Sequence, residues 1–140
     1  MATRQQLKDL ALLRMREAET LFTAGLYDGC AYLCGYVVEL ALKARICATL
    51  GVTEYPEKGS RLRDAMKSHF LDDLGLLAGM GHEFTPSRPR LLANWSIVNE
   101  WKPEWRYEPI GSYDRAAAQK LLDAIRSMPD GVLTCISARW

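Results

Sequence analysis

The sequence has no long hydrophobic run, and this absence limits where the chain can reside. Its longest uncharged apolar stretch, residues 29–38, is about half the length that a membrane-spanning helix needs, and Glu39, Lys43 and Arg45 follow closely. The first residues also lack an apolar signal region. We therefore expect a cytoplasmic protein that has no membrane partner, kept in a reducing environment.

An excess of charge of one sign is also lacking. The formal net charge is +1, whereas a dedicated binder of duplex nucleic acid is usually more basic. The sequence has no glycine-rich phosphate loop, zinc motif or Ser/His/Asp order. Cys30 and Cys34 are one helical turn apart, but no His or acid joins them at ligand spacing, so we expect small buried side chains there. We expect neither a metal nor another cofactor.

The chain does have the length and composition of one globular domain, residues 1–140. Apolar residues make up 49% and charged residues 25%, so a core can form without a disulfide or a metal. Apolar residues recur at helical spacing, and Gly and Pro residues separate the periodic segments. These patterns predict an all-α protein, an antiparallel bundle of five or six helices. The expected helices are residues 4–24, 28–50, 61–78, 89–100 and 113–127, and a short last helix after Asp130 that ends at Ala138.

The second helix is expected to lie at the centre of the bundle. It is apolar on nearly every side from Ala31 to Leu42, apart from Glu39. Asp28 is expected to cap this helix, as Thr3 with Gln6 caps the first, Ser60 the third, Ser112 the fifth and Asp130 the last. Residues 101–111 contain two prolines and cannot be regular helix throughout.

Three stretches of the sequence resemble HEPN domains. The first comprises Glu17, Ala18, Glu19, Leu21, Phe22, Gly25, Tyr27 and Ala31. The second is the apolar run from Tyr36 to Ala44 with Glu39 and Lys43 embedded in it. The third joins a His-x-Leu-x-x-Leu element at His69, Leu71 and Leu74 to a Trp-x-x-Glu-x-Arg-Tyr element at Trp101, Glu104, Arg106 and Tyr107. Their order and spacing span roughly residues 7 to 107.

The resemblance implies a bundle of four or five helices that is often dimeric. The family includes metal-independent ribonucleases of toxin–antitoxin and defence systems, nucleotide-binding modules, and partners of minimal nucleotidyltransferases. It therefore implies a homodimer, RNA or a nucleotide as ligand, and a nucleotidyltransferase or an antitoxin as protein partner. A fold alone does not choose among these functions.

The family's ribonuclease signature is an Arg followed by a polar residue and, a few positions later, a His. Arg63, Asp64 and His69 fit it. In such a site His69 moves a proton at the ribose 2′-hydroxyl and Arg63 holds the scissile phosphate. On one continuous helix, six residues separate these side chains by about 120°. The alternative is a solvated helix face with a buried structural His69.

Glu39 is the most informative single residue, because it interrupts an apolar helix. A buried carboxylate needs a cation or several donors. Arg106 is our first choice of partner and Arg14 the second, while Lys43 lies one turn away on the same helix. Either these residues form a structural ion-pair network, or Lys43, Arg106 and Tyr107 line a nucleotide or phosphate pocket.

Two further clusters leave their role open. Lys58, Arg61, Arg63 and Lys67 form a basic group, which either contacts phosphate or is a solvated face. Trp95, Trp101 and Trp105 favour packing in the core or at a dimer interface over base stacking. This aromatic content between Trp95 and Tyr107, together with the family's habit, predicts a homodimer.

Overall fold

The computed structural model describes residues 2–56 and 66–140, and within these residues the chain is all-α, as predicted. The one pairing of extended backbone in this part of the chain is an isolated bridge between Thr3 and Glu54. Among the described residues, no helix is long and apolar enough to cross a membrane.

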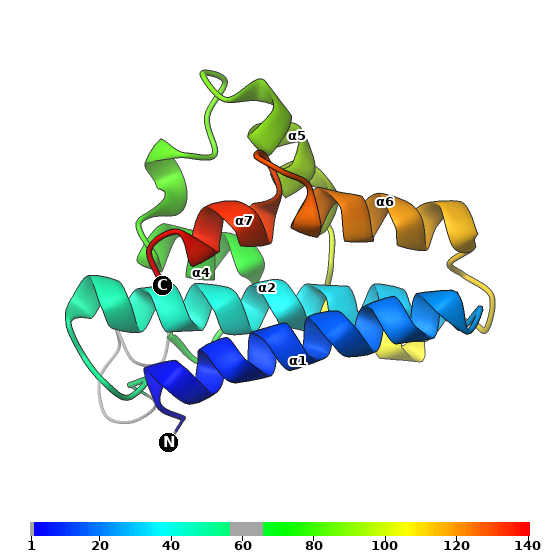
Figure 1. Ribbon diagram of the computed structural model, residues 1–140, viewed down its shortest axis with the longest axis horizontal. Coiled ribbons are helices and arrows are strands. Elements are labelled where there is room, and N and C mark those ends of the chain that lie inside the picture. Colours follow the sequence, from blue (N-terminus) through cyan, green and yellow to red (C-terminus); the bar gives the residue numbers. More distant parts are fainter. Residues whose placement is uncertain (1, 57–65) are drawn as a thin grey trace.

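Two long helices, α1 (Arg4–Thr23) and α2 (Tyr27–Leu50), run antiparallel side by side (Figure 1). The predicted capping box starts α1: the Thr3 hydroxyl accepts from the Gln6 backbone N–H, and the Gln6 side chain accepts from that of Thr3. Gly25, at a φ of 77°, reverses the chain between the helices, a conformation that glycine adopts without strain. Helix α1 lies within one residue of its predicted bounds, and α2 ends at Leu50 as predicted but begins before its predicted cap, Asp28.

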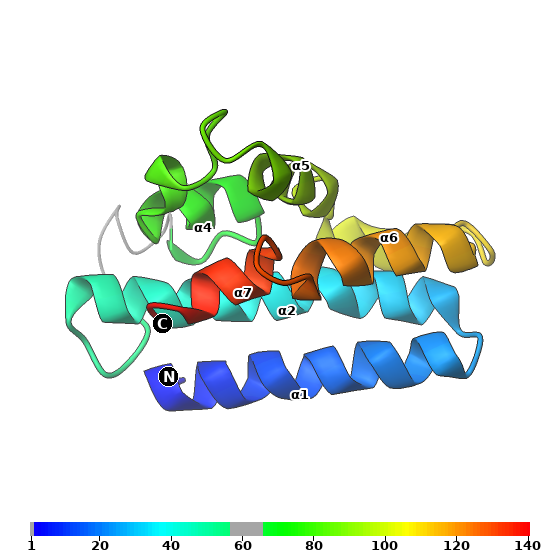
Figure 2. The same ribbon diagram turned by 45° about the horizontal axis from the view of Figure 1, so that its top comes forward.

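The remaining elements form a second layer on the face of α2 that is turned away from α1 (Figure 2). They are α4 (Leu71–Leu77), the 3-10 turn η1 (Met80–His82), α5 (Pro89–Val98), the 3-10 turn η2 (Pro103–Tyr107), α6 (Arg115–Arg126) and α7 (Val132–Ser137). Helix α2 is therefore enclosed between α1 and this layer. Its Val38 and Ala41 are fully buried, which confirms its predicted place at the centre.

Arg45 on α2 is one of the two charged residues that are buried among those described. Its guanidinium lies 3.3 Å from the Glu83 carboxylate, which follows η1, and donates to the Cys135 carbonyl on α7 at 3.5 Å. The pairing satisfies a charge that would otherwise be costly to bury. It also fixes η1 and α7 to the same turn of α2.

The expected cap at Asp28 is wrong. Helix α2 begins at Tyr27, and the Asp28 carboxylate instead accepts from the backbone N–H groups of Gly111 at 2.7 Å and Tyr113 at 2.9 Å. These two hydrogen bonds lower the pKa of Asp28. Asp28 thus fastens the loop before α6 to the start of α2, a contact that local capping rules cannot foresee.

Two further expected caps, at Ser112 and Asp130, are also wrong. Ser112 does not cap α6, because Asp114 accepts from the Ala117 backbone N–H there. Gly131 precedes α7 without a side-chain cap, so Asp130 has no such role. Ser60 lies outside the described residues.

The helix predicted over residues 61–78 is interrupted. Residues 57–65 lie outside the described part of the chain, residues 68–70 are not helical, and α4 begins only at Leu71. The Ser68 hydroxyl accepts from the Phe70 backbone N–H at 3.0 Å and donates to Asp73 at 3.1 Å. Such local bonds compete with the helical pattern. His69 therefore lies in an irregular segment before α4 and not within a helix.

Trp101 ties the irregular stretch after α5 to α2. Its indole N–H donates to the Tyr32 carbonyl at 3.0 Å, and its ring meets the Tyr36 ring edge-on, with the centroids 4.9 Å apart. A Cβ atom at Gly35 would overlap the indole ring. The absence of a side chain at Gly35 is thus what lets Trp101 lie against the helix.

We predict that Gly35→Ala lowers the free energy of unfolding by about 1–3 kcal/mol, because Trp101 must move away from α2. Gly75→Ala on α4 is the matched control. A Cβ there would meet Trp95 at an ordinary 3.4 Å, so the gain in helix propensity should leave stability equal or higher. Urea denaturation measures both variants, and equal effects would contradict the role given to Gly35.

Candidate functional site

The candidate site centres on Glu39, in the middle of α2. Its side chain is 3% exposed, as the sequence predicted. One carboxylate oxygen, Oε1, accepts from Lys43 Nζ at 3.0 Å and from His69 Nδ1 at 2.7 Å. Glu39, Lys43 and His69 are called the His69 cluster below. The other oxygen, Oε2, is buried and has no hydrogen-bond partner among the described residues.

Of the cations considered for Glu39 from the sequence, Lys43 binds it, whereas the first and second choices, Arg106 and Arg14, do not. Arg106 is exposed on η2, and its guanidinium lies 4.8 Å above the Tyr107 ring. The hydroxyls of Tyr107 and Tyr32 raise the pKa of Arg106. Arg106 therefore reaches α2 near Tyr32, about two helical turns from Glu39. The packed rings of Tyr36 and Trp101 cover the turn between them.

Arg14 also has another partner. It binds Glu17, one turn along α1, at 2.9 Å, and both side chains remain partly exposed. Neighbours at this spacing on a helix surface pair readily, so Arg14 needs no partner from α2.

His69 is the accessible member of the His69 cluster. Its side chain is 57% exposed, so the expectation of a buried structural histidine is wrong. Where Glu39 accepts this hydrogen bond as a carboxylate, Nδ1 of His69 is the donor. In the neutral ring with that tautomer, Nε2 holds the lone pair, and it has no partner among the described residues. The ring is thus oriented with its basic nitrogen unoccupied, an arrangement suited to proton transfer.

Lys43 supplies a positive charge just below the surface. Its side chain is 16% exposed, and the ammonium lies 5.4 Å from the centre of the Tyr55 ring. The Tyr55 hydroxyl in turn donates to the Met66 carbonyl, three residues before His69. Tyr55 thus contacts both Lys43 and the segment that leads to His69.

Two tyrosines, whose role was not predicted from the sequence, extend the polar face of α2. Tyr32, Tyr36, Glu39 and Lys43 follow one another at helical spacing, and the two tyrosine hydroxyls are 3.2 Å apart. Burial, the hydrogen bond to Tyr32 and the charges of Tyr32 and Glu39 raise the pKa of Tyr36 to about 12. Its hydroxyl therefore stays protonated near neutral pH. The helical spacing of Tyr32 and Tyr36 from Glu39 was the feature of the sequence that could have indicated them.

The Arg63–His69 pair cannot be placed, because Arg63 lies outside the described residues, as do Lys58 and Arg61 of the basic group. Lys67 is exposed. The separation of about 120° between Arg63 and His69 applies only to an unbroken helix. It does not apply to this chain, because residues 68–70 are not helical.

The aromatic cluster is divided between core and surface. Trp95 and Trp101 are buried, at 6% and 2% exposure, whereas Trp105 is half-buried and Tyr107 is exposed. Most of this aromatic content therefore packs inside the protein. Tyr107 remains available to a partner or a ligand.

The cysteines are free and buried. The contact with Cys34 lowers the pKa of Cys30, while the same contact and burial raise that of Cys34. In residues 2–56 and 66–140, no group of three or more His, Cys, Asp or Glu side chains is placed to hold a metal ion.

We predict that Glu39→Ala lowers the free energy of unfolding by about 3–5 kcal/mol, because it leaves the largely buried Lys43 ammonium unpaired. Glu17→Ala, which breaks the exposed pair with Arg14, should cost less than about 1 kcal/mol. Chemical denaturation of the two variants provides the comparison. A similar, small loss for both would show that the Glu39 pair is no more important than a surface one.

Arg106→Ala tests the revised placement of Arg106. Since Arg106 is exposed and distant from Glu39, its loss should cost less than about 1 kcal/mol, and the double variant Glu39→Ala/Arg106→Ala should be additive within about 0.5 kcal/mol. A larger coupling energy in this cycle would restore the direct pairing.

Comparison with known proteins agrees with this architecture. A family model, described as the HEPN domain, matches residues 5–130 and so includes the whole His69 cluster, Arg106 and Tyr107. No curated protein and no solved structure matches the chain. The family match covers nearly the entire sequence, and this chain therefore belongs to the HEPN domain family.

Proposed function

We propose that this chain is a HEPN module directed at RNA or a nucleotide, with the ligand's phosphate bound at the His69 cluster. The observation that supports this function is that one buried carboxylate holds an exposed imidazole and a lysine ammonium at the same oxygen. A lysine ammonium contacts phosphates directly, and an imidazole does so through Nε2 when that nitrogen is protonated. Glu39 keeps the two groups together before any ligand arrives.

A second candidate function is metal-independent cleavage of RNA, and the free Nε2 of His69 favours it. Nε2 would take the proton of a ribose 2′-hydroxyl, and the 2′-oxygen would then attack the neighbouring phosphorus. The bond from phosphorus to the 5′-oxygen would break, leaving a 2′,3′-cyclic phosphate and a 5′-hydroxyl that gains its proton from solvent. Arg63 is the proposed holder of the scissile phosphate.

The module is also proposed to act with protein partners. We infer a homodimer from the family's habit and from three exposed apolar side chains, Leu26, Tyr107 and Ile110, which are 57%, 75% and 102% exposed. Asp28 binds Gly111, so Leu26 and Ile110 lie near each other at one end of the molecule. A nucleotidyltransferase or an antitoxin is the proposed further partner, within a toxin–antitoxin or defence system.

Cleavage is expected in the presence of a chelator and should depend on His69. With end-labelled single-stranded RNA in excess EDTA, His69→Ala should lower the rate at least about 100-fold, because it removes the base, and Arg63→Ala should also lower it. His82→Ala, at an exposed histidine on η1, is the control and should be unchanged.

Chelator-sensitive cleavage that His69→Ala leaves intact would refute the ribonuclease proposal. If RNA is bound but not cleaved, and His69→Ala weakens that binding, the binding function stands alone. RNA and nucleotide binding that are both indifferent to His69→Ala would remove the proposed site.

The homodimer is tested by sedimentation at tens of micromolar, a range in which an interface of ordinary affinity is occupied. We expect a dimer that Ile110→Asp converts to a monomer, since burying an unpaired carboxylate is costly. Met128→Asp, at another exposed apolar side chain, should leave the dimer intact. A wild-type monomer at that concentration would contradict the proposal.

A further inference from the structure

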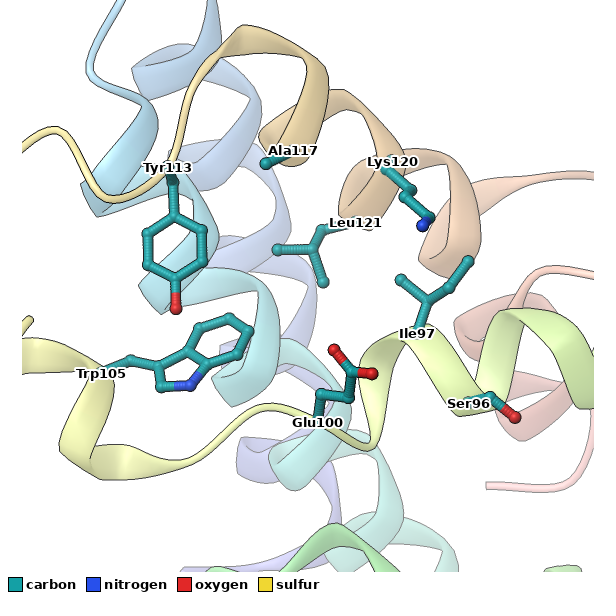
Figure 3. A pocket seen from close by; sticks show the side chains of 8 residues that line it. All are labelled: Ser96, Ile97, Glu100, Trp105, Tyr113, Ala117, Lys120 and Leu121. Atoms are coloured by element: carbon teal, nitrogen blue, oxygen red, sulfur yellow. The ribbon is translucent and has the colours of Figure 1, made fainter.

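A hollow of about 300 Å³ lies apart from the His69 cluster, between the end of α5, η2 and α6 (Figure 3). We call it the Trp105 hollow. Its volume is at the lower end of the range for small-molecule pockets. The side chains that matter for its chemistry are Ile97, Glu100, Trp105, Tyr113, Lys120 and Leu121.

Two aromatic rings form one wall of the Trp105 hollow. The centroids of Trp105 and Tyr113 are 4.8 Å apart, with the ring planes inclined at 35°. The hydrogen bond from the Tyr113 backbone N–H to Asp28 fixes the base of this wall. Burial, followed by the charges of Glu108 and Asp28, raises the pKa of Tyr113 to about 12, so its phenol is neutral near neutral pH. The wall is therefore a fixed, uncharged surface on which a flat ring can stack.

Apolar side chains line the interior of the hollow, and two opposite charges stand at its rim. Figure 3 shows Glu100 next to Trp105, while Lys120 lies beyond Leu121. Neither Glu100 nor Lys120 has an ion pair or a hydrogen bond among the described residues. Charges that served only to neutralise each other would be expected to pair. Because they stand apart around one hollow, the Glu100 carboxylate can accept from a hydrogen-bond donor of a ligand, and the Lys120 ammonium can bind an anionic group of the same ligand.

We propose that the Trp105 hollow binds one nucleotide whose base carries an exocyclic amino group. The base stacks on Trp105, its amino group donates to the Glu100 carboxylate, and its phosphate contacts Lys120. Adenine, cytosine and guanine each present such an amino group, whereas uracil has none and presents a carbonyl oxygen where cytosine has its amino group, which Glu100 repels. The ligand class rests on the proposed function, but the residues and the base preference are additional to it.

The same chemistry can come from a free nucleotide or from one residue of a single-stranded RNA. The two sources differ in how affinity depends on length. AMP alone would saturate the hollow in the first case, whereas in the second an oligoadenylate binds much more tightly than AMP, because neighbouring phosphates add contacts.

The test is a titration of the full chain with AMP and UMP, followed by the indole N–H signal of Trp105 in NMR spectra. We expect AMP to shift this signal and to bind about tenfold or more tightly than UMP, as a hydrogen bond to a charged group allows. Glu100→Gln should remove most of this preference, because the carboxamide can serve uracil as well as adenine. Lys120→Gln should weaken both nucleotides alike.

Matched controls lie in the same part of the chain. Glu104→Gln and Lys102→Gln make the same charge changes at exposed positions that do not line the hollow, and both should bind as the wild type does. Trp105→Phe keeps a ring for stacking and identifies the NMR signal. Oligoadenylate and oligouridylate of equal length, titrated in the same way, separate RNA from a free nucleotide.

Equal binding of AMP and UMP, or a preference that Glu100→Gln leaves unchanged, would overturn the proposal, as would the absence of any shift at Trp105 with both nucleotides and oligonucleotides. His69→Ala separates this result from the proposed function. If cleavage or RNA binding depends on His69 but Trp105 never responds, only the hollow is refuted. If Trp105 responds to AMP and His69→Ala changes nothing, the hollow stands and the His69 cluster fails.

Discussion

The middle of α2 is covered on every side, and most of the structure follows from that constraint. Apolar and small side chains fill nearly all of its positions, and each exception needs a specific partner. Gly35 admits the Trp101 ring, Arg45 takes Glu83, and Glu39 takes Lys43 and His69. Each exception thereby fixes a different segment of the second layer to the same helix. The helix thus sets both the core and the places where polar groups reach the surface.

Glu39 shows how a buried charge can prepare a site. Both of its partners use Oε1, while Oε2 has none among the described residues, so the carboxylate is less well satisfied than a purely structural ion pair would be. The shared oxygen also binds the exposed imidazole of His69 through Nδ1. A reactive group that is already fixed before the ligand binds lowers the entropic cost of binding.

The fold was predictable because it depends on local patterns, whereas the contacts of the site depend on distant ones. The apolar spacing and the Thr3 capping box predicted the positions of α1 and α2 closely. The single acidic residue within an apolar helix predicted that Glu39 is buried. Lys43 was considered, but His69 was missed as a partner because it lies 30 residues away, in a segment that is not helical. Asp28 was predicted as a cap for the same reason, because its hydrogen-bond partners are 83 and 85 residues away along the chain. No pattern within one helix encodes such separations.

The free cysteines of α2 are buried at different points along the helix. Cys30 and Cys47 lie near opposite ends of α2, and both are fully buried. Burial raises the pKa of the Cys47 thiol, while Cys34 lowers that of Cys30. A thiol reagent can reach either sulfur only when the surrounding helices separate, so modification rates report local opening at each end of the helix. The native thiols thus act as chemical probes of local opening, and ligand protection of one end of α2 but not the other would be visible without any mutation.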